Sequence, residues 1–181
     1  NYYDTCMRVC DDLINNFEDK EKGGFFFTSD QHEQLFYRPK SISDDSVPSG
    51  LVYATDTLLY MGFISGNQKY IEAAHRALDF VYKSIDDNLT SSVSAINLLR
   101  EDNLEKEIII VRTNKKTWKK ITNSEEYYGR CIIFIDNELQ NLPDYIAYKE
   151  SKGEFTSYHC KGMTCQTPKL SFEDFIDTLK T

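Results

Sequence analysis

The segment from Leu51 to Ile64 constrains the fold most, because it is apolar on almost every side. A helix of this composition has to be buried all round. Ser65-Gly66-Asn67 follows it, and glycine is the common residue just past the end of a helix. An apolar stripe of helical spacing then runs from about Gln68 to Ile85. Two long helices joined by three residues predict an antiparallel helical hairpin.

Further helices and two strands are indicated on either side of this hairpin. Apolar residues recur at helical spacing from Tyr3 to Phe17 and from Leu89 to Leu99. Residues 108–111 and 131–135 are short, continuous apolar runs separated by a stretch of helical character. Strand, helix and strand in this order, with fully apolar strands, predict a small parallel βαβ unit.

The C-terminal part carries a weaker strand signal and a final helix. Ser157-Tyr158-His159 is expected to add an edge strand, and Ser171 is placed to cap the last helix. We therefore expect a mainly α protein. Its predicted parts are helical hairpins over residues 1–104, a small α/β lobe over 105–170, and a closing helix over 171–181 that packs back on the hairpins.

Composition argues against two classes of protein. The 181 residues include 21 Lys and Arg against 29 Asp and Glu, a formal net charge of −8. A nucleic-acid binder needs a basic surface to neutralise phosphates, so we expect no nucleic-acid partner. No apolar run approaches the roughly 20 residues that span a bilayer, so we expect no membrane partner. Five scattered cysteines favour a reducing cytoplasm over a secreted disulfide scaffold.

The densest polar cluster lies between Phe17 and Gly50, in the connection between two predicted helices. Such connections often carry the groups that converge on a ligand. Carboxylates beside Arg and Lys can serve acid–base chemistry or bind polyhydroxylated ligands. The other interpretation is a solvated loop whose charges pair loosely with each other and pin the loop to the helix ends. Both interpretations stay open on composition alone.

Three motifs, in this order, resemble those of the YyaL-type family. The first is Phe17-Glu18-Asp19…Gly23-Gly24-Phe25-Phe26-Phe27-Thr28. The second is Arg38-Pro39-Lys40…Asp44…Pro48-Ser49-Gly50, followed by Gly66-Asn67-Gln68-Lys69-Tyr70. The third is Tyr158-His159-Cys160…Thr164-Cys165-Gln166-Thr167-Pro168, which is similar to the family's terminal C-x4-C-x-x-P signature.

The resemblance implies a fold and a class of ligand. In this family a thioredoxin-like domain precedes an α/α toroid, similar to those of N-acylglucosamine 2-epimerases and other six-hairpin sugar-active enzymes. It therefore implies a partial α/α toroid from the C-terminal part of a longer chain. The thioredoxin-like and remaining toroid parts of that chain would be its partners. A sugar-like polar ligand, with no cofactor, is implied in the toroid's cavity, edged by the double-glycine and Pro48-Ser49-Gly50 segments.

Eight residues match the family's pattern and are the candidate ligand-binding residues: Asp19, Gly23, Gly24, Arg38, Lys40, Asp44, Ser49 and Gly50. Glycines let backbone approach a ligand closely, and Arg38 offers a planar fork to a carboxylate or phosphate. Leu51 departs from the pattern, because the family usually has Asn there. If that Asn reaches the cavity, Leu51 removes a donor and an acceptor together, and the site is degenerate.

Cys160 and Cys165 form a thiol pair with four residues between them. This spacing is too wide for the C-x-x-C redox motif, and tetrahedral zinc would need two further ligands. We therefore predict no metal centre. Buried thiols that fix a turn are one interpretation of the pair, and a labile disulfide or half of a metal site is the other.

Two functions of different classes follow. The first is an enzyme, or an enzyme remnant, of the sugar epimerase or hydrolase type. Because an incomplete toroid cannot close, we expect no turnover from the isolated chain. The second is a non-catalytic scaffold, an interaction or redox-partner module for a thioredoxin-like domain elsewhere in the full chain. Since the chain opens at Asn1 within a helical pattern, we expect a fragment whose exposed apolar helix face favours homo-association.

Overall fold

The computed structural model describes residues 2–33, 36–85, 89–104, 107–123, 127, 130–140, 142–162 and 164–180. The chain divides into two compact units, Asn1–Leu104 and Glu105–Thr181. We call them the helical unit and the sheet unit and describe each by itself. In the part of the chain that the structure describes, no helix has the length and apolar character needed to cross a bilayer.

The helical unit is built around the predicted hairpin. It contains α1 (Tyr2–Asp12), a π-helical turn (Leu13–Phe17), α2 (Gly50–Ser65), α3 (Gln68–Ser84) and α4 (Val93–Asn103). The α2–α3 turn has Gly66 in the left-handed conformation, with φ +70°. The Asn67 side chain then caps α3 by accepting from Lys69 N at 3.1 Å. Apolar residues of α2 and α3, with Cys10 of α1 and Leu98 of α4, form the core of the unit.

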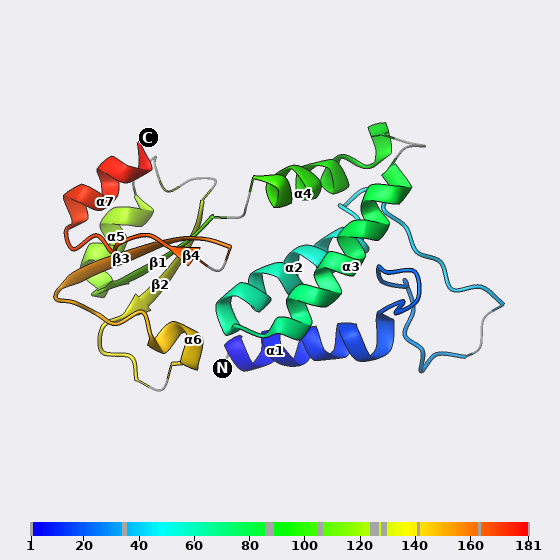
Figure 1. Ribbon diagram of the computed structural model, residues 1–181, viewed down its shortest axis with the longest axis horizontal. Helices are drawn as coiled ribbons and strands as arrows, with labels where there is room; N and C mark the ends of the chain where they lie inside the picture. Colours follow the sequence, from blue (N-terminus) through cyan, green and yellow to red (C-terminus); the bar gives the residue numbers. More distant parts are fainter. Residues whose placement is uncertain are drawn as a thin grey trace. The chain divides into compact units, whose positions relative to one another are not determined.

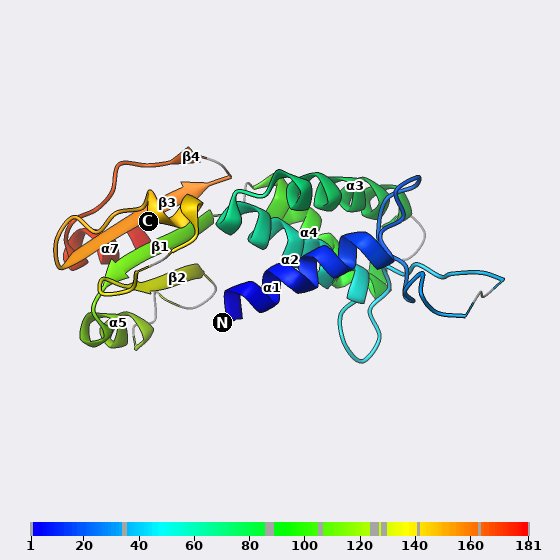
Figure 2. The ribbon, with the colours of Figure 1, turned by 90° about the horizontal axis from the view of Figure 1, so that it is seen from below.

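A long irregular segment, residues 18–49, joins the π-helical turn to α2. Figures 1 and 2 show α1 lying along the hairpin, with this segment extending from the end where α2 begins and α3 ends. In the described part of this segment, strand-like pairing is limited to one isolated bridge between Glu18 and Phe25. The segment is therefore held mainly by side chains rather than by a strand ladder.

The sheet unit contains four strands in the order β2-β1-β3-β4. Its elements are β1 (Glu107–Thr113), α5 (Lys115–Thr122), β2 (Cys131–Asp136), α6 (Asp144–Ala147), β3 (Phe155–Lys161), β4 (Thr164–Cys165) and α7 (Phe172–Leu179). β1 and β2 are parallel, as the apolar runs predicted, whereas β3 is antiparallel to both β1 and β4.

One face of this sheet packs against α5 and α7. Ile109 and Val111 of β1 contact Ile121 of α5 and Phe175 of α7 in one buried cluster. Ser171 caps α7, as the sequence predicted, by accepting from Asp174 N at 3.1 Å. The sequence placed this helix against the hairpins, whereas the structure places it in the sheet unit.

The prediction of a mainly α, partial toroid is wrong. The described residues form a mixed α/β structure in which a four-stranded mixed sheet organises the whole C-terminal part. The error arose at β3, which the sequence analysis treated as an edge. Thr156, Ser157 and His159 give β3 a polar appearance, yet all three are buried, and β3 lies between β1 and β4. A buried strand with polar residues does not produce the continuous apolar run that identifies β1 and β2.

Candidate functional site

Five of the eight candidate residues gather around a tight turn in the helical unit. The turn runs from Asp19 to Gly24 and is closed by Asp19 N donating to Gly24 O at 2.9 Å and Gly23 N donating to Asp19 O at 2.8 Å. Asp19 Oδ1 also accepts from the backbone N–H groups of Glu21 and Lys22, at 3.1 and 3.0 Å. The Asp19 carboxylate therefore fixes its own turn.

The two glycines let this turn lie against α3. Gly23 and Gly24 have φ angles of +75° and +78°, which side chains strongly disfavour. A Cβ on Gly23 would lie 2.2 Å from the carbonyl oxygen of Arg76, and one on Gly24 would lie 2.9 Å from the Phe80 ring. Both positions thus require glycine for close packing on α3.

Lys40 clamps the turn from outside. Its Nζ lies 2.7 Å from Asp19 Oδ2 and donates to Gly23 O at 2.8 Å. It also lies 4.0 Å from the centre of the Phe80 ring, a cation–π contact. Burial opposes ionisation of Asp19, but the hydrogen bonds from Lys40 and from two backbone N–H groups outweigh it and hold the pKa of that carboxyl below its ordinary value.

Arg38, two residues before Lys40, is also held by contacts within the helical unit. Its guanidinium carbon lies 4.1 Å above the Phe26 ring, and its Nη2 donates to the carbonyl oxygens of Thr28 and Asn16. Its Nε is buried with no hydrogen-bond partner among the described residues. Arg38 therefore stiffens the wall of the site and keeps one donor unsatisfied.

Glu18 and Arg76 are site residues that the sequence analysis missed. Glu18 Oε1 accepts from Arg76 Nη2 at 2.6 Å and from Arg76 Nε at 2.8 Å. The Glu18 side chain is 1% exposed, whereas that of Arg76 is 43% exposed. The second carboxylate oxygen of Glu18 is buried without a donor among the described residues. Only its position beside Asp19 in the first motif could have indicated Glu18.

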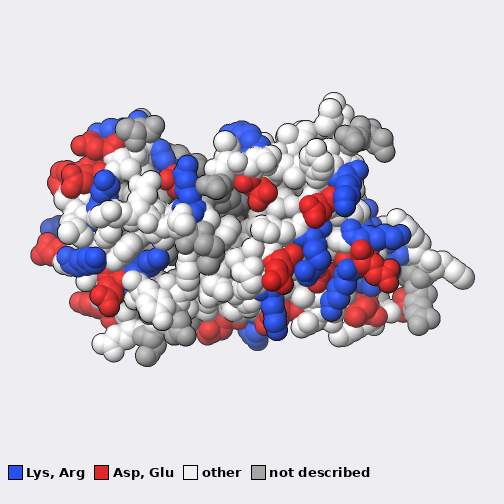
Figure 3. Space-filling model, viewed as in Figure 1, with Lys and Arg blue, Asp and Glu red and all other residues white. Residues whose placement is uncertain are grey.

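Glu18, Asp19, Arg38 and Lys40 help to line a cavity of about 800 Å³, which we call the polar pocket. Its walls combine charged side chains with aromatic rings. They are formed by Asn15, Glu18, Asp19, Lys20, Glu21, Lys22, Phe26, Asp30, Phe36, Tyr37, Arg38, Lys40 and Phe80. Figure 3 shows acidic and basic side chains lying next to each other over much of the helical unit, the part on the right of the view.

Asp44 and Ser49 do not reach the polar pocket. Asp44 accepts from Ser49 N at 3.0 Å, from Ser94 N at 2.8 Å and from the Ser94 hydroxyl. Burial opposes ionisation of Asp44, but these bonds, with one from Val93 N, keep its pKa below the ordinary value. Ser49 Oγ donates to Ser41 O at 2.7 Å and caps α2 by accepting from Val52 N. Both residues therefore fix the start of α2 and tie it to α4.

A second cavity, of about 520 Å³, lies at the start of α2. Phe25–Phe27 and Pro48–Gly50 line it, whereas Gly23 and Gly24 are not among its lining residues. Gly50 has no atom within 4 Å of the place where a Cβ would sit. Leu51, at the position where the family has Asn, is 5% exposed and belongs to the apolar core. This cavity is thus mainly apolar.

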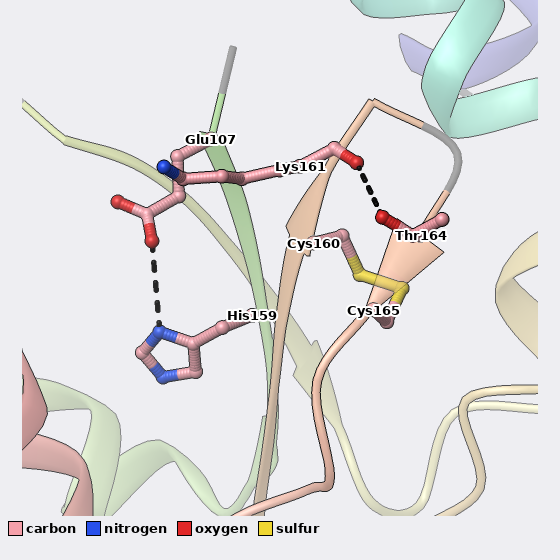
Figure 4. The surroundings of a disulfide bond; sticks show 6 residues. All are labelled: Glu107, His159, Cys160, Lys161, Thr164 and Cys165. Atoms are coloured by element: carbon pink, nitrogen blue, oxygen red, sulfur yellow. Dashed lines mark hydrogen bonds and ion pairs between the residues drawn. A yellow bond between two sulfur atoms is a disulfide. The ribbon is translucent and has the colours of Figure 1, made fainter. Parts of the chain in front are cut away.

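In the sheet unit the thiol pair is a disulfide. Cys160 of β3 is bonded to Cys165 of β4, and the two residues are direct partners in the antiparallel register. Figure 4 shows His159 and Glu107 on the other side of β3 from the disulfide. His159 Nδ1 lies 4.0 Å from Glu107 Oε1. Burial lowers the pKa of His159, against the opposing effect of the Glu107 carboxylate and with smaller contributions from Lys169 and Arg130.

No group of three or more His, Cys, Asp or Glu side chains with the geometry of a metal site occurs within the described ranges. Comparison with known proteins gives no matching family model and no matching curated protein. The functional argument therefore rests on the chain's own residues.

Proposed function

We propose that the helical unit binds a small polyhydroxylated ligand, of the sugar or sugar-phosphate class, in the polar pocket. The observation that carries this proposal is the composition of the pocket wall. Carboxylates, cations and aromatic rings all contribute to it. Ligand pockets typically combine rings that provide contact area with a few polar groups that fix orientation.

The pocket offers groups for both faces of a sugar. Tyr37 and Phe36 are 73% and 114% exposed and line the pocket, so their rings are free to pack on the C–H face of a sugar ring. The exposed carboxylate of Asp30 can accept from hydroxyl groups, and the ammonium groups of Lys20 and Lys22 can donate to hydroxyls or to a phosphate.

We propose binding rather than catalysis at this pocket. A general acid or base works best with a pKa near the operating pH. Asp19 has its pKa held low and its oxygens occupied by Lys40 and two backbone N–H groups. Its ion pair with Lys40 therefore supports a wall that holds its shape, which lowers the entropy cost of binding.

A YyaL-type origin is part of this proposal. It is supported by the order of the three motifs, and by the gathering of Asp19, Gly23, Gly24, Arg38 and Lys40 around one turn. A cytoplasmic location is proposed with it, on the scattered placement of the cysteines. Sequencing the full-length transcript tests the origin: a thioredoxin-like domain upstream supports it, and an unrelated domain there contradicts it.

Isothermal titration calorimetry with glucose, N-acetylglucosamine and glucose 6-phosphate tests the proposed binding. We expect at least one of them to bind the wild-type protein. Tyr37→Ala is expected to weaken that binding about tenfold without changing stability, because its exposed ring supports no core. Lys40→Met is expected to weaken it further, since the turn loses its clamp.

Lys69→Met is the matched control, because Lys69 is an exposed lysine of α3 outside the pocket. It should bind like the wild type. The proposal is wrong if none of the three sugars binds, or if Tyr37→Ala and Lys40→Met bind as tightly as Lys69→Met.

A further inference from the structure

The Cys160–Cys165 disulfide joins residues that already face each other across the β3–β4 hairpin. β4 is two residues long and lies at the edge of the sheet. The Cα atoms of the two cysteines are 3.9 Å apart, closer than the usual range of about 4.4–6.8 Å for disulfides. The bond thus joins the edge strand to its neighbour at a place where the strands already pair.

The hairpin is held without this bond. Gln166 N donates to His159 O at 2.8 Å, next to the disulfide, and Thr164 Oγ1 donates to Lys161 O at 3.1 Å across the turn. Further along, Ser157 and Lys169 exchange two backbone hydrogen bonds, of 2.9 and 3.0 Å. A bridge between residues only five apart also constrains the unfolded chain little. Its contribution to holding the fold is therefore small.

The two sulfur-bearing residues differ in access. Cys160 lies on the interior strand β3 and is 5% exposed, whereas Cys165 lies on the edge strand and is partly exposed. An attacking thiolate therefore reaches the Cys165 side of the bond first. His159 cannot assist it, because neighbouring strand residues point to opposite faces and Figure 4 shows the imidazole across β3 from the sulfurs.

We propose that Cys160–Cys165 is a thiol–disulfide exchange site that accepts electrons from a dithiol. In a reducing compartment, such as the cytoplasmic location proposed above on which this step rests, the disulfides that occur are usually transient and are catalytic or redox-sensing. A bridge that the hairpin does not need fits this class. This proposal concerns the sheet unit alone and does not depend on ligand binding in the helical unit.

The exchange balances in two steps. A thiolate of the dithiol attacks Cys165 Sγ, the sulfur–sulfur bond breaks, and Cys160 leaves with the electron pair and takes a proton from water. The second thiolate of the dithiol then attacks the dithiol sulfur that is bonded to Cys165 in the mixed disulfide. This releases the Cys165 thiolate, which is protonated in turn. The protein gains two electrons and two protons, and the dithiol becomes a disulfide.

The first experiment uses the unmodified chain under native conditions. The protein is incubated with dithiothreitol, alkylated with iodoacetamide and analysed by peptide mass spectrometry, with circular dichroism recorded in parallel. We expect both cysteines to be protected before reduction and alkylated after it, with the circular dichroism spectrum unchanged. Cys6 is exposed and carries a free thiol, so it reports alkylation in every sample.

The second experiment compares Cys160→Ser with Cys165→Ser, each incubated with oxidised glutathione. The free thiol of Cys165 on the edge strand should form a mixed disulfide at least tenfold faster than the buried thiol of Cys160. Glutathione on Cys6 provides the internal reference in both variants.

Three results would overturn the proposal. They are alkylation of both cysteines in the unreduced native protein, reduction that occurs only at urea concentrations that unfold the sheet unit, and equal rates of glutathione addition to the two variants. The first two are read on the wild-type chain, so the test stands even if a serine variant fails to fold. None of these results bears on sugar binding, which is measured at the polar pocket.

Discussion

The two units hold their irregular segments by different means. In the helical unit, the segment 18–49 is fixed by charged side chains that reach across the sequence: Lys40 to Asp19, and Asp44 to Ser94. In the sheet unit, a short hairpin is closed by a covalent bond between residues five apart. A long connection costs more conformational entropy to order than a hairpin, so it depends on many contacts. We therefore expect substitutions in segment 18–49 to lower the free energy of unfolding more than loss of the disulfide does.

The largest effect is expected from Gly23→Ala. The new Cβ would meet the Arg76 carbonyl oxygen at 2.2 Å, on a residue with φ +75°. Left-handed backbone and overpacking together are expected to lower the free energy of unfolding by about 3 to 4 kcal/mol. Urea denaturation followed by circular dichroism measures the change.

Gly50→Ala is the matched control, because no atom lies within 4 Å of its Cβ position and Gly50 is the first residue of α2. It should stay within about 1 kcal/mol of the wild type. Equal losses from the two glycine substitutions would contradict the close packing of the Asp19–Gly24 turn on α3.

An intermediate effect is expected from Asp44→Asn, with a defined pH dependence. The amide can no longer accept all the bonds from Ser49 and Ser94, so we expect a loss of about 2 to 3 kcal/mol at pH 7. The folded pKa of Asp44 lies below its ordinary value of about 3.9. Its stabilisation is therefore complete above that value and is lost as the pH falls through the folded pKa.

Denaturation curves between pH 7 and pH 2 check this sign. The difference in the free energy of unfolding between the wild type and Asp44→Asn should be constant near neutral pH and become smaller in acid. Asp45→Asn, at the exposed neighbouring residue, should show no such difference. A difference in the free energy of unfolding that becomes larger in acid would mean that the Asp44 carboxylate does not tie α2 to α4.

The smallest effect is expected from removing the disulfide with the double substitution Cys160→Ser and Cys165→Ser. A bridge that closes so short a loop stabilises by at most about 2 kcal/mol in the chain-entropy account. The hairpin hydrogen bonds of His159 and Lys161 should persist. Thermal denaturation compared with the wild type measures the loss, and a loss larger than that of Gly23→Ala would reverse the comparison between the units.

The elements that the sequence predicted well are those with regular spacing. The α2–α3 hairpin followed from apolar patterns on consecutive turns, and the parallel pairing of β1 and β2 followed from two apolar runs. Both depend on neighbours in the sequence. β3 was misplaced as an edge because its buried Ser157 and His159 do not look like core residues.

The candidate site was predicted in part, for a similar reason. Asp19 and the glycines lie in the first motif and Lys40 in the second, all within the polar cluster between Phe17 and Gly50, so their gathering could be anticipated from the sequence. Arg76 and Phe80 lie on α3, far from Asp19 in sequence, and no local pattern connects them to the segment. Likewise, the spacing of Cys160 and Cys165 left a disulfide and free thiols open until the β3–β4 register placed them opposite each other.

The most direct test of the central claim is a two-dimensional NMR titration of the wild-type chain with the sugar that calorimetry finds to bind best. The account predicts concentration-dependent shifts of the backbone amides of residues 18–22 and of Tyr37, Arg38 and Lys40, which line the polar pocket. Amides of residues 155–166, around the disulfide, should not move. Shifts confined to the sheet unit, or no shifts at residues 18–22, Tyr37, Arg38 and Lys40 at saturation, would contradict binding in the polar pocket.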